Sequence, residues 1–86
     1  MPPYSLWFKP SVEKDLRRLP RDAAERVLRW TERLRDNAFP RQAIKLSGAE
    51  RLYRIRIGDY RIVYEVDTRA GKVVIQYVRH RRTAYE

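Results

Sequence analysis

The sequence predicts an α+β fold, in which two helices pack on one face of a largely antiparallel sheet and leave the other face open and basic. Two observations predict it. Before residue 38, apolar residues recur at the spacings of three and four that mark a helix face. After residue 50, apolar and polar residues alternate, as in strands with one buried face. The length of 86 residues allows one small domain, spanning 1–86.

The first half of the chain reads as a strand followed by a helical hairpin. Residues 4–8 form a short strand that a proline ends. Ser11 is a favoured N-cap for a first helix over 11–19. Pro20 breaks that helix, and a second apolar stripe predicts a helix over 21–37. A connection then leads to the second half.

The second half reads as a meander of three strands, 51–57, 60–67 and 72–79. Gly58-Asp59 predicts a tight two-residue turn between the first two strands, and "TRAG" turns the chain into the third. Three strands joined by short turns are antiparallel, so the meander supplies most of one sheet.

Alternation along the strands predicts which side chains share a face. One face is apolar and should sit on the helices; it contains Tyr53, Ile55, Ile57, Tyr60, Ile62, Tyr64 and Val66. The opposite face contains Arg54, Arg56, Arg61, Val63 and Glu65. If Asp67 pairs with Lys72, the core also takes Val73, Ile75 and Tyr77, and the arginine face takes Val74, Gln76, Val78 and His80. A slip of one residue would reverse that last assignment.

The hairpin register sets Arg56 directly opposite Arg61. Like charges in such a pair destabilise a sheet. We therefore expect an anion from outside the fold to compensate the arginines.

Charge is the strongest compositional feature. The chain carries 20 Lys and Arg against 11 Asp and Glu, for a net charge of +9. Residues 41–86 hold eleven of the basic and five of the acidic residues. Most of the basic residues are arginine, which contacts phosphate through a fork of donors and stacks on bases. RNA is the partner that this pattern favours, and a solubilising surface is the alternative.

Several classes of site and location are excluded. The chain has no cysteine and one histidine, so we expect no disulfide and no metal site, and it has no Gly-rich phosphate loop or other cofactor motif. Its apolar runs are too short to span a membrane. The opening "MPPYSLWFKP" lacks the features of a secretory signal, so we expect a cytoplasmic location.

The stretches "LYRIRIGDYRIVYEVD" and "VVIQYVRHRRTAYE" resemble the RelE/ParE toxin superfamily, as do "KDLRRLP" and "IKLSG". The resemblance covers nearly the whole chain. It implies a single RelE-like domain and the toxin of a type II toxin–antitoxin pair. It also implies a small RelB-like antitoxin as partner, and with it a toxin–antitoxin hetero-oligomer.

The tail "VRHRRTAY" is similar to the RelE branch, which typically has Val-Gly-His-Arg-Arg and then a tyrosine. Arg79 stands where glycine is usual. The RelE branch implies a metal-independent, ribosome-dependent endoribonuclease. Such an enzyme cuts messenger RNA in the A site by attack of the 2′-OH on the adjacent phosphate, and it stops translation.

The resemblance also implies roles for single residues. It implies that Arg54, Arg56, Arg61, Arg81 and Tyr85 are catalytic, and His80 joins these candidates because histidine is the residue type that ordinarily gains and loses a proton near neutral pH. Further RNA contacts are expected from Lys45, Arg79 and Arg82. His80 either transfers a proton or is a solvated side chain after the last strand. Glu65 is interpreted as a diagonal ion-pair partner of Arg54, and the alternative is that it acts as a general base.

Two other functions stay open at this point. A ParE-like member would inhibit DNA gyrase and would perform no RNA chemistry. An inactive relative would bind only RNA or the antitoxin.

Overall fold

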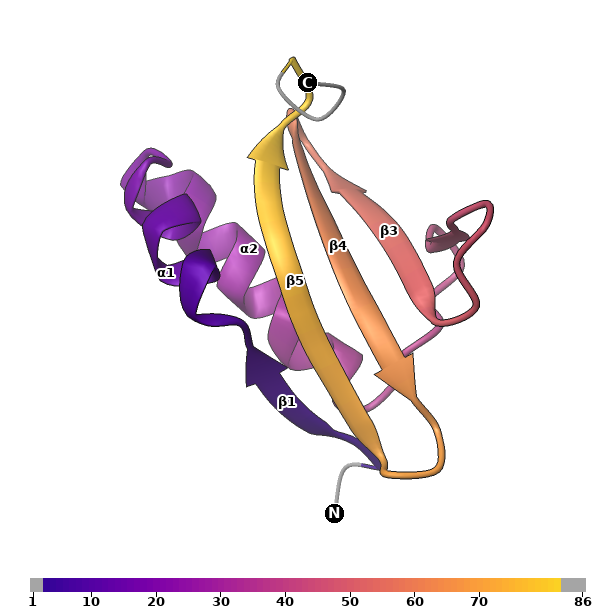
Figure 1. Cartoon of the computed structure of the whole chain (residues 1–86). Helices are drawn as coiled ribbons and strands as arrows, with labels where there is room; N and C mark the ends of the chain where they lie inside the picture. Colours follow the sequence, from indigo (N-terminus) through magenta and orange to yellow (C-terminus); the bar gives the residue numbers. More distant parts are fainter. Residues whose placement is uncertain (1–2, 83–86) are drawn as a thin grey trace.

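The structure is a computed structural model that describes residues 3–82. Within this range the elements are β1 (Ser5–Phe8), α1 (Pro10–Arg17), α2 (Arg21–Leu34), β2 (Ile44–Lys45), β3 (Leu52–Ile57), β4 (Tyr60–Asp67) and β5 (Lys72–His80). The strands form one sheet in the order β1-β5-β4-β3-β2, and both helices lie on the same side of it (Figure 1). The predicted α+β architecture is therefore confirmed.

The two edges of the sheet differ from a simple meander. β1 pairs with β5 in parallel, because the helical hairpin carries the chain away from β1 before the meander begins. The short β2 pairs antiparallel with β3, in a segment that the sequence predicts as a connection. The three long strands form the expected antiparallel meander.

The helix boundaries shift from the predicted ones by one to three residues. α1 begins at Pro10, with Lys9 as N-cap, so Ser11 is not the cap. Proline suits the first helical position because its missing N–H would have no partner there. α1 ends two residues and α2 three residues before the predicted ends. α1 ends early because the ring of Pro20 clashes with helical backbone at the residue before it. Neither helix in the described range is long and apolar enough to cross a membrane.

The hydrophobic core lies between the helices and the inner face of the sheet, which is the face toward the helices. Its fully buried members include Val12, Val27, Leu34, Ile55, Ile62, Tyr64, Val73 and Ile75. The Tyr64 hydroxyl donates a 2.8 Å hydrogen bond to the Ala38 carbonyl. Burial raises the pKa of Tyr64, so this hydroxyl remains protonated. The bond ties the chain after α2 to the centre of the sheet.

The β3–β4 hairpin has the register that the sequence predicts. Ile57 pairs with Tyr60, and Arg56 pairs with Arg61. Gly58 has a φ of 57°, in the left-handed region that glycine adopts without a steric penalty. The arginines of this hairpin therefore point to the outer face of the sheet, which is the face away from the helices.

A β-bulge in β5 changes which side chains share a face. Asp67 pairs with Lys72 as expected, and Tyr64 still pairs with Ile75, but Val63 pairs with Tyr77. Gln76 is thus an extra residue, and the alternation beyond it is inverted. Val78 is buried in the core at 2% exposure. The prediction that Tyr77 faces the core, with Val78 and His80 on the arginine face, is therefore wrong.

Candidate nucleic-acid interface

Three arginines form a line across the outer face near the β3–β4 turn. Arg56 on β3 pairs with Arg61 on β4, and Arg61 pairs with Arg79 on β5. We call these three residues the arginine row. The bulge creates the row, because without the extra residue Arg79 would point to the inner face.

Burial differs along the arginine row. Arg61 occupies the central strand and is 6% exposed, whereas Arg56 and Arg79 are exposed. Within residues 3–82, neither Arg56 nor Arg79 forms an ion pair with a carboxylate. Two accessible guanidinium groups therefore flank a third that packing holds in place. Such an arrangement offers several donors to an anion that lies across the strands.

Arg54 adds a fourth guanidinium to the outer face. It lies two residues before Arg56 on β3 and pairs with Val63. Glu65 lies diagonally from Arg54 on the same face, but no ion pair within 4.0 Å joins them. The interpretation of Glu65 as the partner of Arg54 is therefore wrong. Within residues 3–82, Arg54 and Arg56 make no ion pair with a carboxylate, so their charge is available to a ligand.

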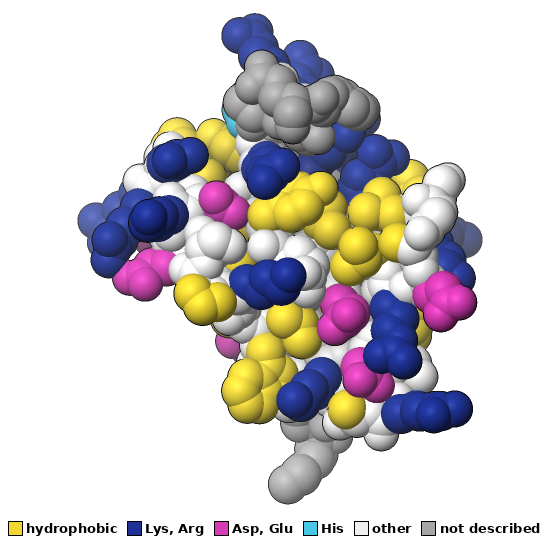
Figure 2. Space-filling view, viewed as in Figure 1, with side chains coloured by type: hydrophobic (Ala, Val, Ile, Leu, Met, Phe, Trp, Pro, Cys, Tyr) yellow, Lys and Arg dark blue, Asp and Glu magenta, His cyan; other side chains and the backbone are white. Residues whose placement is uncertain are grey.

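Lysine and arginine side chains are spread over the view in Figure 2, around the end that carries the hairpin turn as well as along the left side and the lower part, and hydrophobic side chains occupy the upper middle. The expected open face is thus basic at several places and apolar between them. Lys45 does not belong to this face. It pairs with Tyr53, so strand alternation directs its side chain to the face opposite Arg54.

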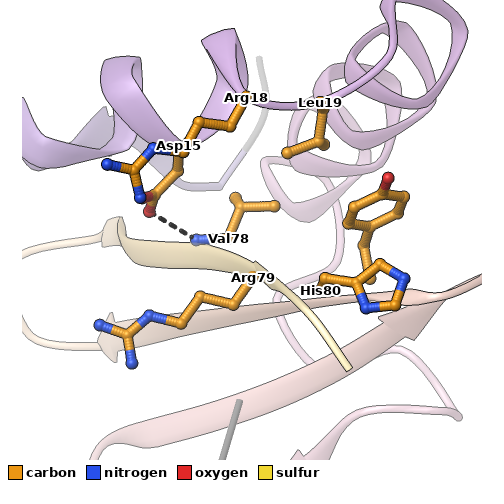
Figure 3. A pocket seen from close by; sticks show the side chains of 7 residues that line it. Asp15, Arg18, Leu19, Val78, Arg79 and His80 are labelled. Carbon is orange, nitrogen blue, oxygen red and sulfur yellow. Dashed lines mark hydrogen bonds between the residues drawn. The ribbon is translucent and has the colours of Figure 1, made fainter. Parts of the chain in front are cut away.

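His80 lies on the inner side of the sheet, apart from the arginine row. It pairs with Tyr60, and the two rings meet edge to face with centroids 5.3 Å apart. The side chain of His80 lines a pocket together with Asp15, Arg18 and Leu19 of the helical hairpin (Figure 3). Its Nδ1 accepts a 3.2 Å hydrogen bond from the backbone N–H of Arg82. The structure therefore places the His80 side chain on the other face of the sheet from Arg56 and Arg61, although Arg79 also lines its pocket and Arg82 is hydrogen-bonded to it.

The residues after β5 are tied to the hairpin turn. The backbone N–H of Arg81 donates a 2.7 Å hydrogen bond to the carbonyl of Asp59. The Arg81 Nε also lies 3.8 Å from an Asp59 carboxylate oxygen. Arg81 and Arg82 are exposed at this end of the molecule. Tyr85, the remaining candidate catalytic residue, lies outside the described residues.

A carboxylate from α1 supports β5 next to the arginine row. β1 pairs with β5 only as far as Ile75, so the edge of β5 beyond that residue has no strand partner in the described range. There the Asp15 carboxylate accepts a 3.0 Å hydrogen bond from the backbone N–H of Val78 (Figure 3). Since Val78 precedes Arg79, this bond fixes the backbone that carries the third arginine of the row.

Tyr77 is the outer-face residue that the sequence reasoning assigned incorrectly. It is half-buried and pairs with Val63, next to the row. The guanidinium carbon of Arg79 lies 4.1 Å from the centroid of its ring. The sequence contains a weak sign of this arrangement, because Tyr77 and Val78 are adjacent apolar residues that cannot both face the core of a regular strand.

Comparisons with known proteins agree with this fold. Residues 6–85 match the family described as the ParE toxin of the type II toxin–antitoxin system parDE. A relative from Methanocaldococcus jannaschii that carries the name toxin RelE1 is 31% identical over 78 residues, 87% of each chain.

Two solved structures are also similar. The archaeal RelE–RelB complex from Pyrococcus horikoshii OT3 has a TM-score of 0.84 at 32% identity, covering 98% of this chain and 100% of that one. The RelBE2 toxin–antitoxin complex from Mycobacterium tuberculosis has a TM-score of 0.80 at 28% identity, covering 91% and 98%.

Proposed function

Because the chain belongs to the RelE/ParE superfamily of type II toxins, we propose that it cleaves messenger RNA in the ribosomal A site and that its arginine row binds the RNA backbone. The observation that supports this proposal most is the row itself. Like charges set side by side on adjacent strands are unfavourable in the free protein. A phosphate that bridges them would remove that cost.

The proposed chemistry uses the nucleophile of RNA. The 2′-OH attacks the adjacent phosphorus, a P–O bond forms, and the bond to the 5′ oxygen of the next nucleotide breaks. The upstream fragment ends in a 2′,3′-cyclic phosphate, and the downstream fragment begins with a 5′-OH. The reaction passes through a phosphorane with more negative charge on its oxygens than the starting phosphate, and guanidinium groups stabilise that charge.

Four arginines divide this task. Arg56 and Arg61 contact the scissile phosphate, and Arg54 contacts a neighbouring phosphate along β3. Arg81 stands at the turn end of the row and stabilises the charge that develops on the leaving oxygen. Tyr85 orients the 2′-OH or stacks on a base. Arg82 adds a weaker contact to RNA at the periphery, whereas Lys45 lies on the opposite face and is assigned none.

Proton transfer does not fall to the arginine row, because arginine stays protonated at any ordinary pH. His80 opens to a pocket on the other side of the sheet, so we do not assign it the proton of the 2′-OH. In this proposal the ribosome completes the site. The isolated protein should therefore bind RNA and cut it slowly.

A ParE-like action on DNA gyrase is the second candidate function, and the family match to ParE toxins favours it. The experiment that separates the two measures both activities on one preparation. We expect the protein to cut a message on programmed ribosomes, to cut the same free RNA far more slowly, and to leave supercoiling by gyrase unchanged. Inhibited supercoiling with intact messages would overturn the proposal.

The partner of the toxin is the remaining part of the proposal. The solved structures that are similar to this chain include RelE–RelB toxin–antitoxin complexes. We propose that a small RelB-like antitoxin binds this chain. Since the toxin has a net charge of +9, the antitoxin segment that contacts it should be acidic. Co-expression with the product of an adjacent reading frame, followed by purification through one partner, tests the complex. Separate elution of the two chains at low salt would contradict it.

A further inference from the structure

Tyr77 and Arg79 form a stacked pair beside the phosphate-binding arginines. The Arg79 guanidinium carbon lies 4.1 Å from the centroid of the Tyr77 ring. The two residues are two positions apart on β5 and point to the same face beyond the bulge. Arg79 is exposed, so the guanidinium side turned away from the ring is open to solvent. The ring thus supports a flat cation with one free face.

The surroundings of the pair leave room for a ligand. On the β4 side, Tyr77 lies next to Val63, which is 3% exposed, so the ring packs beside a buried apolar side chain. On the other side, β1 ends where Phe8 pairs with Ile75, so in residues 3–82 no strand flanks Tyr77 there. A planar group can therefore approach from the sheet edge and lie over Arg79 with an apolar surface beside it.

We propose that Tyr77 and Arg79 form a base-binding subsite, in which one nucleobase of single-stranded RNA stacks on the Arg79 guanidinium while the Tyr77 ring supports it from behind. Bases in single-stranded RNA commonly stack on arginine planes and aromatic rings. The subsite rests on the proposed function, since it needs RNA whose phosphate lies on Arg56 and Arg61. Arg61 and Arg79 are paired on adjacent strands, about 5 Å apart, a span that a ribose can bridge.

A second cation–aromatic pair on the outer face provides a matched control. Lys72 lies 4.8 Å from the centroid of the Trp7 ring. Trp7 pairs with Val74, so it shares the outer face but lies on the far side of the bulge from the arginine row. The Lys72 ammonium also offers no plane on which a base can stack. If aromatic exposure alone bound RNA, Trp7 at 52% exposure would contribute more than Tyr77.

The test compares two RNA probes of equal charge. One is a labelled single-stranded RNA decamer, and the other is the same length with abasic ribose at every position. Binding of the full chain is measured by fluorescence anisotropy over a series of salt concentrations. We expect native protein to bind the base-bearing RNA about tenfold more tightly than the abasic RNA.

Three variants then show which side chains cause the tighter binding of the base-bearing RNA. Tyr77→Leu removes the ring, and Arg79→Lys keeps the charge but removes the plane. Both should reduce the preference to less than about threefold, with the salt dependence unchanged because neither substitution changes the charge of the protein. Trp7→Leu should keep the tenfold preference. Thermal unfolding of each variant confirms that it is folded, and Arg79→Lys, at an exposed position, is the one least able to disturb the fold.

The outcomes separate the subsite from the proposed function. If Tyr77→Leu and Arg79→Lys keep the preference, or if Trp7→Leu loses it, the subsite is wrong although RNA binding stands. Equal weakening of both probes by Arg79→Lys would also overturn the subsite and leave a phosphate contact. Native protein that binds neither probe with salt dependence would overturn the proposed function, and the subsite with it.

Discussion

Replacing Arg56 by glutamine should stabilise the free protein. Arg56 lies directly opposite Arg61, which is itself paired with Arg79 on its other side. Within residues 3–82, Arg56 makes no ion pair that the substitution would break. Glutamine keeps much of the side-chain stem while it removes one of two opposed charges. The repulsion is then relieved with little loss of packing.

The expected size of the effect follows from the cross-strand geometry. Directly opposed side chains place two guanidinium groups about 6 Å apart, at which Coulomb repulsion in water is about 0.7 kcal/mol. The dielectric of water applies on the Arg56 side because that residue is exposed. For a domain of this size, 0.7 kcal/mol corresponds to a rise in Tm of about 3–5 °C. The rise should disappear in about 1 M salt, where charges are screened within about 3 Å.

Thermal unfolding at low and at high salt measures this directly. The matched control is Arg29→Gln, which removes one charge from the exposed surface of α2 and leaves the arginine row intact. We expect the control to change Tm by less than about 1 °C. A fall in Tm for Arg56→Gln, or an equal rise in the control, would refute the reasoning. The first result would show that the fold itself holds Arg56, and the second that only net charge matters.

Three further predictions concern the scaffold. Asp15→Ala should lower the free energy of unfolding by about 1–2 kcal/mol in urea titrations and speed amide exchange at Val78, because it removes the acceptor of the Val78 N–H. Asp15→Asn, which keeps an acceptor oxygen, should lower the free energy of unfolding less, and equal losses in the two variants would contradict this role. Tyr64→Phe should cost about 1–3 kcal/mol by leaving the buried Ala38 carbonyl without its donor, and an unchanged urea midpoint would contradict it. The backbone N–H of Ala70, in the β4–β5 turn, donates to the Asp67 carboxylate and lowers the pKa of that carboxyl. The ionised carboxylate therefore stabilises the fold above the ordinary pKa of aspartate, and this stabilisation is lost as pH falls through the lowered pKa. The stability difference from Asp67→Asn should therefore vanish in acid, and a difference independent of pH would contradict this.

The hairpin could be predicted from the sequence down to single pairs. Gly58 marks the turn, and a two-residue turn fixes Arg56 opposite Arg61. On either side of the turn, Ile55, Ile57, Tyr60 and Ile62 occupy every second position, so only one register buries them on the same face. The turn residues and the pattern of burial therefore predict the same register, and that register places the arginines on the outer face.

The second half of β5 could not be predicted in the same way. In "VVIQYVRH" either face of the strand could be the buried one. Burying the odd-numbered positions places Val73 and Ile75 in the core, and burying the even-numbered positions places Val78 there. A bulge at Gln76 lets the strand use both. Whether a strand contains such an extra residue depends on its pairing with β4, and the alternation within β5 alone does not encode that. His80 and Arg79 consequently exchange faces relative to the prediction.

The parallel β1 and the position of Asp15 also lie beyond local patterns. β1 contacts β5 across more than sixty residues of sequence, and Asp15 reaches Val78 over a similar separation. Nothing in the residues around Asp15 distinguishes it from the other acidic residues of the helices. Its role follows only once α1 lies beside the unpaired edge of β5.

The rate of message cleavage on programmed ribosomes by the Arg56→Gln/Arg61→Gln variant tests the central claim most directly. The rate is measured in a single turnover, at saturating protein, after native-like thermal unfolding has been confirmed. If the arginine row holds the scissile phosphate, the rate should fall at least about 100-fold, the loss typical of removing a group that stabilises a developing negative charge. Cleavage by the folded double variant at the native rate would contradict the account, because the phosphate would then lie elsewhere on the molecule.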